Sequence, residues 1–303
     1  MELKYSQKIA TELNISNKQV NSIYVLHTEG STIPFIARYR KEATGNLDEV
    51  VIGNVISQVK YFNELDKRKE TVLKTIEEVG KLTPELKKRI DDSVNATELE
   101  DIYLPYKPKR KTRAAVAIEK GLEPLATLLF SQQNINTEEE AGKYLNEEVK
   151  DKIEALQGAR DIIAEWIAEH EQSRSIIRKI FTSEAELTSR VLTSKKEDMD
   201  AQKYRDYFGY CEALAKSPSH RILAIRRGEK EGFLIMDINI EKEKAIEELK
   251  RKFLTSANAA SQQVSLAIED SFSRLLKPSI ETEFRMAAKT KADEEAIRVF
   301  AEN

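Results

Sequence analysis

The chain has 303 residues, about two domains of ordinary size, and is long enough to bury a proper core. Charged residues make up 33% of it, above the globular average of roughly 25%, and it contains only 10 glycines and 7 prolines. These numbers favour long helices with charged outer faces over a sheet-rich fold, which needs more turn residues. The formal net charge of −3 gives no general attraction for phosphate, so any nucleic-acid contact must come from a local basic patch.

The sequence also indicates in which cellular compartment the protein is expected. Cys211 is the one cysteine, so a disulfide framework is impossible and a reducing compartment is expected. The N-terminus is polar and amphipathic, and no apolar run reaches the roughly 18 residues that a membrane-spanning helix needs. We therefore expect a cytoplasmic protein without a membrane partner.

Helix signals fill the first hundred residues. The spacing of apolar residues predicts a short helix over 4–14 and a long one over 48–79, in which Val51, Val55 and Val59 begin the apolar stripe. Ser16/Gln19 and Thr97/Glu100 match the capping box that opens a helix. Glycine stops, proline starts and capping residues add helices over 16–30, 34–45 (carrying Phe35, Ile36 and Tyr39), from Thr83, and from Thr97.

Pro105 and Pro108 then break the chain, because each keeps its preceding residue out of helical conformation. Several short helices are expected in the next seventy residues: 112–121, 124–130, one after a Thr137/Glu140 capping box, 152–170 and 174–181. This density of short helices is typical of a small module of helix-turn-helix type.

The predicted secondary structure changes after Ser183, where the first strands are expected. Segments 187–193 and 232–240 predict two strands, which we expect to pair as the only notable β element. Between and after them we expect helices over 203–210, 218–228, 243–254 and 260–276, an interruption at Pro278, and a last helix over 293–303. That last helix has no capping signal, so we expect the chain to be cut from a longer protein.

Catalytic patterns are missing from the sequence. His27, His170 and His220 have no second histidine at metal-ligand spacing, so they are interpreted as surface or capping residues. Cys211 lacks the signature of a nucleophile and is expected to be a small buried hydrophobe. Glu98, Glu100 and Asp101 could hold magnesium, but acids also suit the first turn of a helix. No glycine-rich phosphate loop occurs. We therefore expect no catalysis, no metal and no cofactor.

A basic stretch offers the best binding candidate. Its residues combine five cations with a tyrosine: Tyr106, Lys107, Lys109, Arg110, Lys111 and Arg113. Such a patch suits phosphate contact together with stacking on an unpaired base, but a solubilising linker has the same composition. Two further groups are more typical of charged helix faces: Arg38, Arg40 and Lys41, and then Arg221, Arg226, Arg227 and Lys230.

Six strings resemble, in the same order, the N-terminal region of the bacterial Tex transcription accessory proteins: IPFIARYRKE (33–42), LEDIYLPYKPKR (99–110), LQGARDII (156–163), KYRDYF (203–208), SHRILAIRRG (219–228) and KADEEAIR (291–298). The resemblance implies a multidomain helical protein related to a eukaryotic elongation factor that acts with RNA polymerase. It also implies later RNase H-like, helix-hairpin-helix and OB-type RNA-binding domains that do not fit within these residues.

The expected fold is thus mainly α. A multi-helix body over 1–110 and 185–303 would carry one small β ribbon, and a helix-turn-helix-like insert, implied by the resemblance, would occupy 111–184. The expected function is non-catalytic, sequence-independent binding of RNA or DNA and scaffolding in transcription. One alternative is a protein-interaction platform toward RNA polymerase or ribosome-associated proteins, with the cations merely solubilising. The other, a nuclease-like enzyme, is opposed by the missing metal-ligand set.

Overall fold

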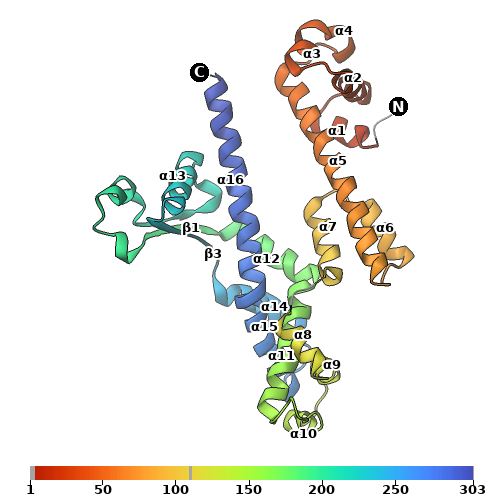
Figure 1. Cartoon of the computed structure of the whole chain (residues 1–303), viewed down its shortest axis with the longest axis vertical. Helices are drawn as coiled ribbons and strands as arrows, with labels where there is room; N and C mark the ends of the chain where they lie inside the picture. The colour runs from red at the N-terminus through yellow and green to blue at the C-terminus, as the bar shows by residue number, and fades with distance from the viewer. Residues whose placement is uncertain (1–3, 109–110, 303) are drawn as a thin grey trace. The chain divides into compact units, whose positions relative to one another are not determined.

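The computed structural model describes residues 4–108 and 111–302, and it is mainly helical with one small sheet (Figure 1). This confirms the predicted fold class. The chain separates into two compact units, Met1–Pro108 and Lys109–Asn303. Each unit has its own hydrophobic core, built within its own part of the described chain.

Helices make up the first unit: α1 Ser6–Leu13, α2 Asn17–Thr28, α3 Ile33–Tyr39, α4 Lys41–Thr44, α5 Glu49–Glu78, α6 Pro84–Asp92 and α7 Ala96–Tyr103, followed by the 3-10 turn η1 Leu104–Tyr106. The long helix α5, orange in Figure 1, contributes more residues to the core of this unit than any other helix. Asp48 caps it by accepting a hydrogen bond from the Val51 N–H at 2.8 Å. Gly80, at φ +68°, follows its end in the left-handed conformation that glycine adopts without strain.

Local capping chemistry explains where several helices begin. The predicted Ser16/Gln19 capping box at the start of α2 is present, and Thr83 caps α6. The predicted boxes at Thr97/Glu100 and Thr137/Glu140 are wrong. The helices α7 and α10 begin slightly earlier, because Asn95 and Asn136 accept the capping hydrogen bonds from Thr97 and Glu139.

The second unit is also mostly helical: α8 Arg113–Glu119, α9 Glu123–Phe130, α10 Thr137–Gly142, α11 Lys152–Glu169, α12 Glu171–Glu184, β1 Glu186–Val191, η2 Thr193–Lys195, η3 Met199–Tyr207, β2 Gly209–Ala213, η4 Leu214–Lys216, α13 Ser219–Lys230, β3 Leu234–Asn239, α14 Lys242–Phe253, α15 Ala259–Asp270, η5 Ser271–Leu276 and α16 Lys277–Glu302. The central helix α11 packs against α8, α9 and α15. The hydrophobic core of the second unit therefore includes residues from before and after position 184. The three-part division into 1–110, 111–184 and 185–303 stays a prediction, because compactness alone does not establish which segments fold independently.

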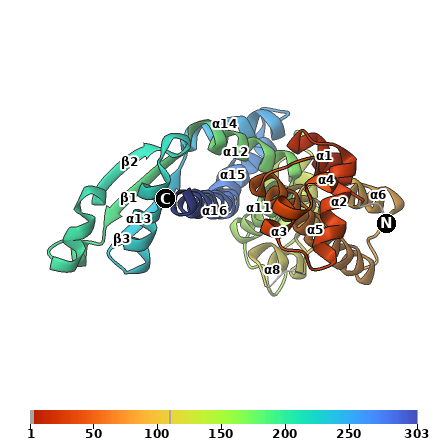
Figure 2. The ribbon, with the colours of Figure 1, turned by 90° about the horizontal axis from the view of Figure 1, so that it is seen from above.

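The sheet has the strand order β2-β1-β3, with both pairs antiparallel (Figure 2). The predicted pairing of 187–193 with 232–240 is confirmed, since Thr188 stands opposite Asp237. The strand β2 is a correction. Residues 203–210 were expected to form one helix, but η3 ends at Tyr207 and Gly209 starts a strand that pairs with β1.

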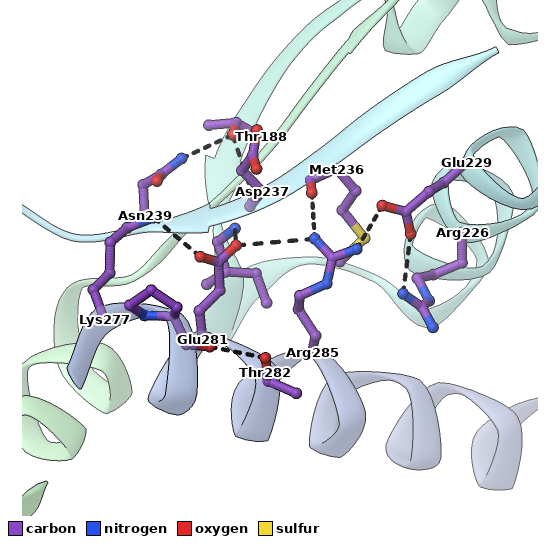
Figure 3. Close-up of polar contacts among 12 residues, drawn as sticks. Thr188, Arg226, Glu229, Met236, Asp237, Asn239, Lys277, Glu281, Thr282 and Arg285 are labelled. Atoms are coloured by element: carbon purple, nitrogen blue, oxygen red, sulfur yellow. Dashed lines mark hydrogen bonds and ion pairs between the residues drawn. The ribbon is translucent and has the colours of Figure 1, made fainter. Parts of the chain in front are cut away.

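The outer edge of β3 is covered by α16 (Figure 3). Glu281 accepts a hydrogen bond from the Ile238 N–H at 3.0 Å, and Arg285 donates one to the Met236 carbonyl oxygen. Arg285 also contacts Glu229 of α13 at 2.5 Å. These contacts tie the last helix to the sheet and satisfy backbone groups that an edge strand leaves unpaired.

The last helix is longer than predicted. Pro278 does not interrupt it, because α15 passes through the π-helical segment η5 directly into α16, with Pro278 in its first turn. Pro278 lies two residues after Leu276, the end of this π-helical segment, where the regular i→i−4 hydrogen bonds of the helix are already interrupted, so its missing N–H does not end the helix. None of the helices within 4–108 and 111–302 is long and apolar enough to cross a membrane.

Candidate nucleic-acid interface

The basic stretch spans the boundary between the two units. Tyr106 and Lys107 end the first unit, and Lys111 and Arg113 begin the second. Lys109 and Arg110 lie outside the described residues. The structure therefore describes four of the six predicted residues, two in each unit.

Tyr106 is half-buried and packs against the core of the first unit. It belongs to η1, whose end is fixed by a hydrogen bond from the Lys107 N–H to the Tyr103 carbonyl oxygen at 3.1 Å. Lys107 itself is exposed. Tyr106 is thus only partly accessible to solvent, while the neighbouring Lys107 side chain is exposed.

Lys111 and Arg113 flank the capping residue of α8. Thr112 accepts a hydrogen bond from the Ala115 N–H at 3.0 Å, which starts the helix at Arg113. Lys111 makes one ion pair, with Glu119 at 4.0 Å, and the two side chains are 74% and 67% exposed. Such a pair contributes little to stability. Cations at a helix start also oppose its macrodipole, so helix stability does not explain these two residues.

Arg113 also lines a cavity of about 240 Å³ between α8 and α11. Its apolar wall includes Val116 and Leu122, and its polar side includes Gln157 and Asp161. Burial raises the pKa of Asp161, although the hydrogen bond from Gln157 and the nearby Arg274 guanidinium oppose this effect. The half-buried Asp161 carboxylate thus lines the same cavity as Arg113, the last residue of the basic stretch.

The two weaker basic groups differ from each other. Arg221 and Arg226 hold carboxylates of the second unit, Glu212 at 3.3 Å and Glu229 at 3.0 Å, which is a structural use of their charge. In the first unit, Arg38 pairs with Glu49 at 3.5 Å. Arg40 and Lys41 are exposed, and no ion pair joins either to a carboxylate in the described part of the chain.

The aromatic partners of Arg40 were missed as site residues by sequence reasoning. Phe35 and Tyr39, one turn apart on α3, are 39% and 65% exposed. Their ring centroids are 5.3 Å apart, and the Arg40 guanidinium lies 5.4 Å from the Phe35 centroid. The signal was present in the string FIARYR, where two aromatic residues at i and i+4 alternate with arginines.

The residues considered for catalysis have structural contacts. Arg68 binds the Glu100 carboxylate through two hydrogen bonds, at 2.6 and 3.0 Å, and Asp101 is buried. His170 caps α12, accepting from the Gln172 N–H at 3.2 Å. The prediction for Cys211 is wrong: it is exposed on β2 rather than buried in a helix. Partial desolvation and the nearby Glu186 carboxylate raise the pKa of its thiol, which disfavours the reactive thiolate.

Comparison with known proteins gives two family matches. Residues 3–77 match the Tex-like protein N-terminal domain, and residues 132–300 match the Tex central region. The chain is 39% identical over 303 residues to the transcriptional accessory protein Tex of Neisseria gonorrhoeae, covering 97% of this chain and 40% of that protein. It is 41% identical over 302 residues to protein YdcI of Bacillus subtilis, covering 98% of this chain and 42% of the relative.

A human relative, S1 RNA-binding domain-containing protein 1, is 27% identical over 313 residues, which cover 98% of this chain and 31% of that protein. The chain therefore spans less than half the length of each of these relatives. Together, the two family models cover most of the chain, in the order in which its two units occur. The chain belongs to the Tex family.

Proposed function

We propose that this chain is a non-catalytic segment of a transcription accessory protein that binds RNA or DNA without sequence preference and acts as a scaffold. The family supports the setting, since one relative is named a transcriptional accessory protein and another an S1 RNA-binding domain-containing protein. The observation that carries the proposal is the exposure of Lys107, Lys111 and Arg113; within residues 4–108 and 111–302, the ion pair that joins any of them to a carboxylate is the long one between Lys111 and Glu119.

Exposed cations in a proline-flanked stretch suit contact with phosphate. Each ammonium or guanidinium group that neutralises a phosphate releases condensed counterions, which makes binding favourable and dependent on salt. Phosphates are the same at every position of a nucleic acid, so such contacts position the strand without reading its sequence. The negative net charge of the whole chain confines this attraction to the local patch.

The test is a salt titration of binding to a single-stranded RNA and to a DNA duplex of equal length. Contact with about four phosphates gives a log–log salt slope of roughly −3 to −4. Replacing Lys109, Arg110 and Lys111 with alanine should flatten that slope by about 2 to 3. A matched control replaces three exposed lysines of the first unit, Lys81, Lys87 and Lys88, and removes the same charge. The control should keep the slope of the parent protein.

Equal flattening by the control would show that net charge, rather than the basic stretch, governs binding. Absence of binding even at low salt would favour the protein-interaction platform instead. One observation supports that alternative: Met286 and Ile297 on α16 are 66% and 68% exposed. They are separated by three helical turns and therefore lie on one side of the helix, as in a surface that takes an apolar partner.

A further inference from the structure

The helix α3 is anchored from one side and leaves its aromatic residues on the other. Ile36 and Ala37 are buried in the core of the first unit, and α3 packs on α2, α4 and α5. Phe35 and Tyr39 are both exposed on the outer side. Burying an aromatic side chain is favourable, so leaving two of them partly in water gives up stabilisation that a bound partner could recover.

The two rings and a guanidinium form a continuous surface. Phe35 and Tyr39 have their planes tilted by 41°, and Arg40 lies over the face of Phe35. Arg40 is also held by a hydrogen bond from its Nη1 to the Tyr39 carbonyl oxygen at 3.4 Å. Aromatic faces and arginine planes both stack on nucleic-acid bases.

The backbone beneath this surface is fixed. The Gln19 Nε2 donates to the Thr44 carbonyl oxygen at 2.7 Å, and the Thr44 hydroxyl donates to the Arg40 carbonyl oxygen at 3.2 Å. Gly45 then ends α4 with φ +69°, and a Cβ there would lie 2.6 Å from the Gln19 amide nitrogen. These contacts hold Arg40 and α3 in place, so binding costs little backbone conformational entropy at this surface.

The charges around the rings favour a phosphate-containing partner. The neighbouring acids have local roles: Asp48 caps α5, Glu49 pairs with Arg38, and Glu42 lies in the first turn of α4, where the helix dipole favours it. Arg40, which lies over the Phe35 ring, and Lys41, the next residue of the chain, are both exposed cations. The residues with most of the binding energy for a protein partner are typically ringed by contacts that exclude water. Here the rings stand instead next to exposed cations, which suits phosphate better.

We propose that Phe35, Tyr39 and Arg40 form a stacking platform for the unpaired bases of single-stranded nucleic acid, with Lys41 contacting the backbone phosphate. This inference rests on the proposed nucleic-acid binding and adds a second contact surface, on the first unit. The platform distinguishes single strands from duplexes, because the bases of a duplex are already stacked on one another. It has no sequence preference, because every base has a π face.

The experiment measures binding of the whole chain to fluorescein-labelled oligouridylate and to a DNA duplex of equal length. Tyr39→Ala should weaken binding to the single strand by roughly 5- to 150-fold, the range expected for losing one stacked base. Binding to the duplex should change less than about twofold. Tyr39→Phe keeps the ring and should keep the affinity. The double change Arg40→Ala/Lys41→Ala should flatten the salt slope by about 1 to 2.

The control is Val50→Ala, which removes a 70% exposed apolar side chain from the same unit and should leave affinity unchanged. Crosslinking with 5-bromouridine RNA should label the peptide that contains Phe35 and Tyr39. Unchanged binding by Tyr39→Ala, or an equal loss in Val50→Ala, would overturn the platform. If the alanine change at Lys109, Arg110 and Lys111 still flattens the slope in that case, the proposed function stands without the platform. If the parent protein binds neither probe at low salt, both proposals fail.

Discussion

The carboxylate of Glu281 on α16 accepts a hydrogen bond from the backbone N–H of Ile238 on β3, at 3.0 Å (Figure 3). One turn further along α16, Arg285 donates to the carbonyl oxygen of Met236 on the same strand. Glu281 and Arg285, four residues apart on the helix, thus make hydrogen bonds to backbone groups at the edge of β3 that no neighbouring strand pairs. Lys277 supports the arrangement by pairing with Glu281 at 3.0 Å.

Removing the Glu281 carboxylate should destabilise the second unit. Glu281→Ala leaves the Ile238 N–H without its acceptor, and a buried donor that loses its partner costs about 1–3 kcal/mol. Glu281→Gln keeps an acceptor oxygen and should cost less. Unfolding in urea can be followed through Trp166, the single tryptophan of the chain, which lies in the second unit. Equal stability of Glu281→Ala and the parent would show that the contact has no energetic role.

The sequence predicts features that depend on neighbouring residues. The helix starts at Ser16 and Thr112 follow from side chains that reach a backbone N–H three residues on, and both capping hydrogen bonds are present. Asn95 was missed because Thr97 and Glu100 fit the same local pattern equally well. The family, too, follows from ordered strings of residues and is confirmed.

Several features that depend on distant residues were not predictable, although the pairing of β1 with β3 was predicted. The strand β2 has few β-branched residues, and only its pairing with β1 gives it a strand conformation. Helical spacing places Phe35 and Tyr39 on one face, but the burial of Ile36 and Ala37 decides that this face points to solvent. The same limit applies to Cys211, whose exposure follows from its place on β2.

Gly158 allows α8 and α11 to approach closely. A Cβ at this position would lie 2.3 Å from Cδ1 of Leu122 and 3.3 Å from Cβ of Ala117, both of which are buried. Gly158→Ala should therefore destabilise the second unit by about 1–3 kcal/mol through overpacking, despite the better helix propensity of alanine. Gly142→Ala is the matched control, because its Cβ would meet only the end of the Lys152 side chain at 3.4 Å. Thermal unfolding of both variants checks the difference, and equal melting temperatures would contradict it.

Asp66 is expected to make the stability of the first unit sensitive to acid. Burial alone would raise the pKa of Asp66, but hydrogen bonds from Tyr5 and Lys4 outweigh it and hold the pKa below its ordinary value. The unfolded state therefore binds its proton first as the pH falls. The stability that Asp66 contributes is complete above the unfolded pKa, near 4, and is lost as the pH falls through the lower folded pKa.

Asp66→Asn should accordingly lower stability near neutral pH and flatten the loss of stability below about pH 4. Hydrogen-exchange protection of the α1 and α5 amides, corrected for intrinsic exchange rates, measures this for the first unit. Glu64→Gln removes an exposed acid from the same helix and should leave the pH dependence unchanged. The same acid sensitivity in Asp66→Asn as in the parent would rule out this carboxylate as its source.

The last prediction concerns the segment 111–184, which the resemblance to the Tex family implies to be a helix-turn-helix-like insert. In the structure, α11 packs against α15 and η5, and the shared core includes Val264, Ile268 and Phe272 from beyond the segment. Cutting at 184 would expose the apolar face of α11, at a cost of about 25 cal/mol for each Å² of apolar surface that remains in water. We therefore expect residues 111–303 to unfold cooperatively and residues 111–184 alone to lack a cooperative transition. Circular dichroism during heating compares the two fragments directly. A sharp transition in the shorter fragment would establish the insert as an independent domain, because its own helices would then suffice to form a core.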